Sequence, residues 1–243
     1  MSNLLVIGDL HEPFSRVGYF EFCKSLYQKY QCNKVLFIGD VVECHSISFH
    51  PKSPQMPNAS KEIELAHKAV EKWYKTFPNA KICIGNHDSR IVRLAETVNI
   101  PEKCLLSFSE LWKTPEWEWN WNFKIDGVHY THGQGITTGA IHPAYTMMRN
   151  MAMSVVIGHK HTAAGIKWLC NPYQRLFGMD VGSGIDDNAL AFEYGRFLAT
   201  KSVISAAVVI NGMPYLELMP MSKGEKYHDS KIKKEKDDKS RRN

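Results

Sequence analysis

Five times this chain runs a short apolar segment into a glycine or threonine and then places an Asp, Asn or His directly after it. The segments and the residues that follow are 4–8 before Asp9, 35–39 before Asp40, 82–85 before Asn86, 128–131 before His132 and 155–158 before His159. Short apolar runs of this kind are typical of buried strands. Ligands of open α/β sheets bind beyond the carboxyl ends of such strands. The pattern therefore predicts an α/β protein that gathers these polar side chains at one site.

The side chains at these strand ends are those that bind transition metals. The full set of candidate ligands is Asp9, His11, Asp40, Asn86, His132, His159 and His161. Asp9 and His11 are two residues apart, as are His159 and His161, so on an extended strand each pair shares a face. A carboxylate such as Asp40 can bridge two cations and offset their repulsion. The mixed oxygen and nitrogen set favours Mn, Fe, Zn, Co or Ni over Mg or Ca.

The order of elements changes half-way along the chain. The first half predicts strands at 3–8, 34–38 and 80–84 that alternate with helices at 17–30, 60–77 and 89–98, which indicates a parallel sheet. Ser60 is the expected cap of the second helix. The second half predicts strands at 116–123, 124–131, 155–158, 163–169, 175–181, 202–210 and 215–219 and a helix at 141–153. Hairpin turns are expected at 126–127 and 211–212, both of the sequence Asx-Gly. Two facing sheets flanked by helices accommodate all of these elements.

The composition of the chain indicates its domain organisation and its cellular setting. With 243 residues and 44% hydrophobic content, a single domain over residues 1–221 is expected. No signal peptide or membrane-length apolar run is visible, and six cysteines without a CxxC pair indicate reduced thiols in a cytoplasmic protein. Residues 222–243 hold seven Lys and two Arg against five acidic residues, a net charge of +4. Such a segment is expected to be a solvated, disordered tail, with contact to nucleic acid as the alternative.

The motif blocks together resemble the calcineurin-like metallophosphoesterases. The blocks in order are Gly-Asp-Leu-His at 8–11, Gly-Asp at 39–40, Gly-Asn-His-Asp at 85–88, His-Gly at 132–133 and Gly-His-Lys-His at 158–161. The resemblance implies a four-layer α/β/β/α sandwich of two facing mixed sheets, with two divalent metal ions, Mn foremost, at the strand ends. It implies that Asp9, His11, Asp40 and His161 hold one ion and that Asp40, Asn86, His132 and His159 hold the other.

The same resemblance implies a mechanism of phosphoester hydrolysis. A hydroxide bridging the two ions would attack phosphorus, and His87, next to Asn86, would face the leaving group as an acid. Asp88 is expected to orient His87 or to cap the following helix, and the two roles are compatible.

Departures from the family pattern bear on the substrate. Protein phosphatases of this superfamily carry Gly-Asp-x-x-Asp-Arg-Gly, whereas this chain has Glu43 and Cys44 at the last Asp and the Arg. The missing arginine, the long loop after Glu43 and the basic tail favour phosphodiester substrates, such as a nucleic acid or a nucleotide. The alternatives are a phosphomonoesterase or protein phosphatase, and a weakly active metal-binding subunit serving a partner protein. Arg90 and His45 are candidates for substrate contact, with solvated helix or loop positions as the alternative.

A row of indoles completes the pattern. Trp117, Trp119 and Trp121 alternate with polar residues, which places them on one strand face. A buried core face is the favoured interpretation, and a surface that stacks bases is the alternative.

Overall fold

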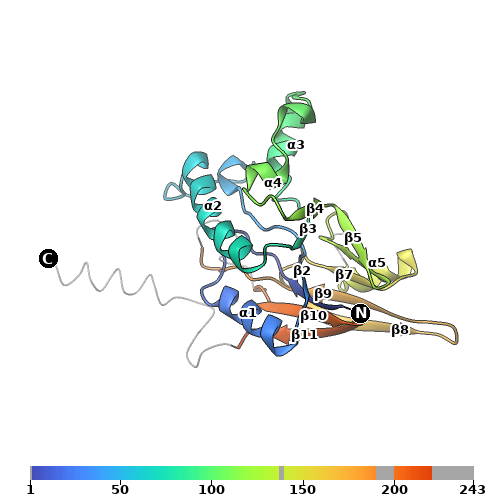
Figure 1. The fold of residues 1–243 in the computed structure, drawn as a ribbon. Helices are drawn as coiled ribbons and strands as arrows, with labels where there is room; N and C mark the ends of the chain where they lie inside the picture. The colour runs from blue at the N-terminus through green and yellow to red at the C-terminus, as the bar shows by residue number, and fades with distance from the viewer. Residues whose placement is uncertain (1, 137–139, 190–199, 221–243) are drawn as a thin grey trace.

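Strand β1 (Asn3–Ile7) carries apolar side chains on both of its faces, and this explains the layering of the molecule. Leu5 and Ile7 point to one side of the sheet and Leu4 and Val6 to the other, and all four are buried. Since alternate residues of a strand face opposite ways, such a strand needs a packed layer on each side. The computed structural model, which describes residues 2–136, 140–189 and 200–220, shows these layers (Figure 1).

Two mixed sheets pack face to face. The first has the order β11-β10-β1-β2-β3-β4 and comprises, besides β1, strands β2 (Lys34–Phe37), β3 (Lys81–Cys83), β4 (Glu118–Asn120), β10 (Ser205–Ile210) and β11 (Met213–Leu218). The second has the order β5-β6-β7-β9-β8 and comprises β5 (Asn122–Ile125), β6 (Val128–Thr131), β7 (Val155–Ile157), β8 (Ala164–Cys170) and β9 (Arg175–Val181). β1, β2 and β3 are parallel neighbours, as are β6 and β7, so their carboxyl ends lie at the same edge of each sheet.

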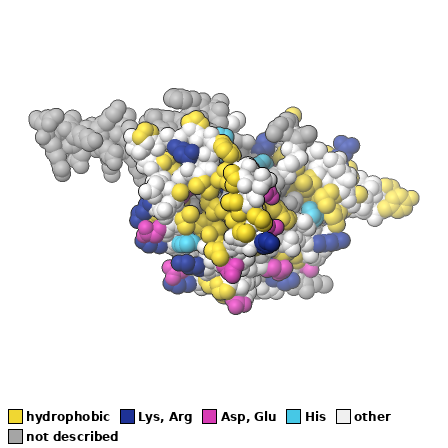
Figure 2. All heavy atoms as spheres, turned by 90° about the horizontal axis from the view of Figure 1, so that it is seen from above, with side chains coloured by type: hydrophobic (Ala, Val, Ile, Leu, Met, Phe, Trp, Pro, Cys, Tyr) yellow, Lys and Arg dark blue, Asp and Glu magenta, His cyan; other side chains and the backbone are white. Residues whose placement is uncertain are grey.

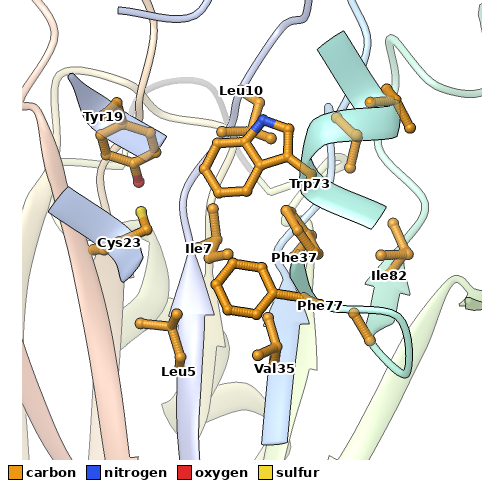
Figure 3. Close-up of a cluster of buried hydrophobic side chains, with 14 of the residues drawn as sticks. Leu5, Ile7, Leu10, Tyr19, Cys23, Val35, Phe37, Trp73, Phe77 and Ile82 are labelled. Carbon is orange, nitrogen blue, oxygen red and sulfur yellow. The ribbon is translucent and has the colours of Figure 1, made fainter. Parts of the chain in front are cut away.

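Helices cover the outer faces. α1 (Tyr19–Lys29) and α2 (Ala59–Thr76) bury Tyr19 and Trp73 against the first sheet, where Phe37 of β2 joins them (Figure 3). α5 (Pro143–Met151) packs Met148 against the second sheet. The expected four-layer α/β/β/α sandwich is thereby confirmed. Among the described residues, the remaining helices are α3 (Arg90–Thr97), α4 (Phe108–Leu111) and the 3₁₀ turns η1 (His45–Ile47) and η2 (Glu102–Cys104).

Most expected elements are present, with shifted ends. Both Asx-Gly hairpins form, joining β5 to β6 and β10 to β11. The expected cap Ser60 is wrong, because α2 begins one residue earlier and the Asn58 side chain accepts from the backbone N–H of Lys61 at 2.9 Å. The 3₁₀ turns η1 and η2 and the short helix α4 have no counterpart among the expected elements.

The expected strand over residues 116–123 is wrong, because it divides between the two sheets. β4 pairs with β3 in the first sheet, and the chain then crosses at Trp121 to β5 in the second. Trp117 is buried and Trp119 packs on the same core, but Trp121 is 49% exposed. A core face therefore holds for the first two indoles only, since the crossing breaks the period-two alternation before the third.

Two further features concern the cysteines and the length of the helices. The six cysteines, all among the described residues, are free, and only Cys104 and Cys170 are exposed. Within the described part of the chain, no helix has the length and apolar character needed to span a membrane.

Candidate metal centre

The five strand ends converge where the two sheets meet. β1, β2 and β3 of the first sheet deliver Asp9, Asp40 and Asn86, and β6 and β7 of the second deliver His132 and His159. The seven predicted ligands are thus brought together from both sheets. Asp9, His11, Asp40 and His132 are buried, whereas His159 and His161 stay partly accessible at the rim.

One group of ligand atoms forms around His161. Its Nε2 lies 3.1 Å from Asp9 Oδ2 and 3.0 Å from His11 Nε2. His11 Nε2 in turn lies 3.5 Å from Asp40 Oδ2. Four side chains, Asp9, His11, Asp40 and His161, therefore present ligand atoms to a common point.

A second group forms around His132 and shares the same carboxylate. His132 Nε2 lies 3.1 Å from Asp40 Oδ2, 3.2 Å from His159 Nδ1 and 3.1 Å from Asn86 Oδ1. Asp40 Oδ2 is therefore common to both groups. A single oxygen between two ligand sets is the arrangement expected of a carboxylate that bridges two cations.

These donors fit divalent metal ions. Neighbouring ligands of an octahedral ion with bonds of about 2.1 Å lie about 3 Å apart, close to the spacings observed here. The imidazoles are also prepared to bind, because His132 Nδ1 is 3.1 Å from the carbonyl oxygen of Ile38 and His11 Nδ1 hydrogen-bonds Glu43. A proton held on Nδ1 leaves the Nε2 lone pair free for an ion.

The buried carboxylates of the site create a negative field that favours a cation. Burial works against charge on His132, but the carboxylates of Asp40 and Asp9 raise the pKa of this imidazole to about 9. Asp9 Oδ1 is buried and has no hydrogen-bond partner among the described residues. Buried carboxylates of this kind are stabilised by a cation.

The backbone turns sharply at three ligands, in a way that the sequence pattern did not predict. His11, Asp40 and His159 have positive φ values of 52°, 48° and 67°. This conformation is unfavourable for residues other than glycine by roughly 1–2 kcal/mol and is concentrated at functional sites. The expectation that Asp9 and His11 share a face of an extended strand is therefore wrong. Their side chains converge because the chain leaves the strand and turns back.

Two glycines let the ligand loops approach each other. A Cβ on Gly85 would lie 2.1 Å from Asp40 Oδ1, and a Cβ on Gly158 would lie 2.2 Å from Asp9 Oδ1. Neither carboxylate could then keep its position.

We expect Gly158→Ala to lower metal affinity by roughly 10–100-fold, the range seen when the surroundings of a metal ligand are disturbed. Gly165→Ala is the matched control, because no atom lies within 4 Å of its added Cβ. Metal titration followed by calorimetry measures both variants. Equal affinity in the two would show that Asp9 does not need its observed position.

His87 lies beside the bridging carboxylate with its ring held from behind. Its Nδ1 is 3.0 Å from Glu43 Oε2, and its Nε2 is directed toward Asp40, 3.9 Å from Oδ2. Burial opposes charge on His87, but Asp40 and Glu43 raise the pKa of its imidazole above the ordinary value. The two carboxylates thus favour the protonated form of a ring that lies at the edge of the two ligand groups.

Glu43 is the functional residue that sequence reasoning missed. It is buried, and it contacts both His11 and His87 as well as the Arg90 guanidinium at 3.6 Å. The available signal was its place three residues after Asp40, where the family pattern has an acidic residue. Burial would raise the pKa of Glu43, but the imidazoles of His11 and His87 hold it well below its usual range.

Asp88 serves neither of its two expected roles. Its oxygens accept from the backbone N–H groups of Val42 at 3.1 Å and Gly85 at 2.8 Å, and the carboxylate at His87 Nδ1 is that of Glu43. α3 begins at Arg90, after Ser89 as the N-cap residue. Burial, with the nearby Asp40 charge, raises the pKa of Asp88 to about 7. Asp88 therefore ties the loop after β2 to the loop after β3.

A family comparison agrees with this geometry. The sequence model of the calcineurin-like phosphoesterases matches residues 2–174, which include all seven of the ligands. The chain belongs to the calcineurin-like phosphoesterase family.

Solved structures of similar fold include proteins with different described roles. Yfce, a phosphoesterase from E. coli, is 14% identical with a TM-score of 0.45, the match covering 86% of this chain and 88% of that chain. Vacuolar Protein Sorting 29 from Cryptosporidium parvum is 14% identical with a TM-score of 0.44, covering 91% and 98%. The nuclease MPE from Pseudomonas putida is 12% identical with a TM-score of 0.35, covering 88% and 86%. No curated protein sequence matches this chain significantly.

The two candidate substrate residues, Arg90 and His45, are both buried. Arg90 Nη1 donates to the carbonyl oxygens of Glu43 at 2.7 Å and Cys44 at 2.9 Å. His45 lies in η1, its Nδ1 3.5 Å from Glu43 Oε1, and its backbone N–H donates to Glu62 of α2. The loop after Glu43 is therefore anchored at its start, and direct substrate contact by Arg90 or His45 stays a prediction.

Proposed function

We propose that this protein is a binuclear metal-dependent phosphoesterase that hydrolyses phosphodiester bonds, in a nucleic acid or a nucleotide. The observation that carries the proposal is the sharing of Asp40 Oδ2 by two groups of ligand atoms, with the His87 ring directed at the same oxygen. A site of this form can take two cations and one proton donor side by side.

The proposed ligands divide between two ions. Asp9, His11, Asp40 and His161 would hold one, and Asp40, Asn86, His132 and His159 the other, with manganese as the first metal to test. When bound, such ions supply positive charge for the phosphoryl oxygens and lower the pKa of water for attack on phosphorus.

The six free cysteines support a cytoplasmic setting within this proposal.

The chain itself supplies the proton for the leaving group. His87 Nε2 faces the site, and Glu43 holds Nδ1, so the imidazolium can donate from Nε2 to the departing oxygen. Glu43 then stabilises the orientation of the ring through the transfer. A protein that only bound metal as a subunit would have no use for a proton donor such as His87.

The charge around the site favours a diester over a monoester. A phosphomonoester is a dianion and needs more positive side chains than a singly charged diester. Arg90, the nearest buried guanidinium, already donates to two loop carbonyls and faces Glu43. Arg93 donates to the Asn86 carbonyl oxygen at 2.6 Å, which leaves part of its fork available to one phosphate.

The test is hydrolysis of bis-p-nitrophenyl phosphate beside p-nitrophenyl phosphate in the presence of Mn²⁺. Faster cleavage of the diester is the expected result. Faster cleavage of the monoester would promote the phosphomonoesterase alternative. Bound metal without hydrolysis of either compound would count against an enzyme and in favour of a metal-binding subunit.

Deletion of residues 222–243, which lie outside the described residues, should leave hydrolysis of bis-p-nitrophenyl phosphate unchanged. The segment has almost no apolar residues, so it contributes little to a packed core, and the candidate ligands all precede it. Steady-state kinetics of the full and shortened chains make the comparison. A large loss of kcat in the shortened chain would mean that the tail belongs to the site.

A further inference from the structure

A small apolar pocket lies behind the loop that carries Asn86 and His87. It is bounded by α3, η2 and α4, and its volume is about 280 Å³. Its apolar lining consists of Ile91, Val92, Leu105, Leu106, Phe108 and Leu111. Figure 2 looks down on the end of the molecule where α3 lies in Figure 1, and hydrophobic side chains gather in the middle of that face. Leu106 is 64% exposed, so this side of the pocket is open to solvent.

The polar atoms of the pocket are already satisfied. Asp88 also lines it, but both carboxylate oxygens accept from the backbone N–H groups of Val42 and Gly85. A charged ligand would therefore find no free partner in Asp88. The lining favours an uncharged, apolar group.

The volume and the aromatic wall favour a flat ring. The Phe108 ring stacks on Trp119 with centroids 5.4 Å apart and an interplanar angle of 18°, so it forms a fixed aromatic wall. An apolar cavity of about 150 Å³ is enough for benzene, and pockets for drug-sized ligands begin near 300 Å³. A volume of about 280 Å³ therefore suits one or two fused rings and is too small for a helix or a strand.

We propose that this pocket binds a compact aromatic group of a small molecule, with Phe108 as its stacking wall and Leu106 at its entrance. The aromatic group has two possible sources, the ester group of a substrate or a separate effector. Either occupant would touch the segment that holds the catalytic loop in place, because Asp88 joins the loops after β2 and β3.

The chain carries its own test pair, the two exposed cysteines. Cys104 lines the pocket, and Cys170 lies at the end of β8 away from it. The full chain is equilibrated with the symmetrical disulfides of N-naphthoylcysteamine and N-acetylcysteamine, with excess 2-mercaptoethanol to allow exchange. The Cys thiolate displaces one thiol of either disulfide, and the two reagents differ only in the acyl group. Peptide mass spectrometry then counts the two adducts at each cysteine.

The expected result is a naphthoyl excess of about tenfold at Cys104 and comparable adducts at Cys170, in line with the contribution of a small apolar group to binding. Leu106→Asp should remove the excess at Cys104, and its exposed position keeps the fold intact. No preference at Cys104, or the same preference at both cysteines, would overturn the pocket as an aromatic site.

Kinetics with free N-acetyl-naphthylmethylamine separate the two sources and rest on the proposed function, whereas the exchange experiment does not. A rise in KM for bis-p-nitrophenyl phosphate alone assigns the pocket to the substrate. A change in kcat with KM unaltered assigns it to an effector. If the metal-loaded protein hydrolyses nothing while Cys104 still selects the naphthoyl group, the proposed function fails and the pocket stands.

Discussion

Asp40→Asn is expected to abolish phosphoester hydrolysis and to reduce the metal content of the protein. Asp40 Oδ2 lies 3.5 Å from His11 Nε2 and 3.1 Å from His132 Nε2, so both ligand groups depend on one oxygen. The amide of Asn has nearly the shape of the carboxylate but carries no charge to offset the repulsion between two cations. The loss should therefore exceed the effect of removing any ligand that serves one ion.

Metal analysis of the purified variant and its rate on bis-p-nitrophenyl phosphate measure this effect. Asp180→Asn is the control, since Asp180 is also buried but accepts from the backbone N–H of Ala144, outside the ligand groups. The control should keep its metal and its activity. Full activity in Asp40→Asn would contradict the bridging role.

His87→Ala is expected to retain the bound metal and to slow turnover by roughly 10²–10⁴-fold, the usual contribution of a general acid. The reason that turnover should fall while the metal stays bound is geometric. His87 Nε2 stands 3.9 Å from Asp40 Oδ2, farther than His11 Nε2 at 3.5 Å and His132 Nε2 at 3.1 Å from the same oxygen, and its Nδ1 faces Glu43. The ring can therefore reach a leaving group without holding an ion.

The comparison needs metal content and kcat on the same preparation. His129→Ala serves as the control. His129 lies on β6 and faces away from the group of ligand atoms that includes His132. A substrate with a better leaving group should lose less rate in His87→Ala, since its oxygen needs less protonation. An emptied site in this variant would make His87 a ligand and remove its proposed role as an acid.

Much of the fold was predictable because strand burial leaves a strong pattern. β1 and β2 each present apolar side chains to both faces, and only a strand between two packed layers has that need. The Asx-Gly turns at 126–127 and 211–212 were equally clear, since both residues of each turn have positive φ. The split of residues 116–123 between two sheets was not predictable. Apolar and polar residues alternate along this segment of the sequence without a break at the point where the chain crosses.

The sequence alone determined which side chains could form the candidate metal centre. Each ligand directly follows a strand-like run or stands two residues beyond a ligand that does, and parallel strands bring such positions to one edge. The chain order and the spacing of Asp9, Asp40, Asn86, His132 and His159 therefore carried the prediction without knowledge of any contact.

Only the tertiary structure decided how these side chains meet and what supports them. The left-handed turns at His11, Asp40 and His159, the placement of Glu43 between two imidazoles, and the use of Asp88 to tie two loops all depend on contacts between distant segments. A sequence pattern reports the local preference of the chain. Such contacts arise when separate strands and loops pack together, and their energy outweighs the local preference.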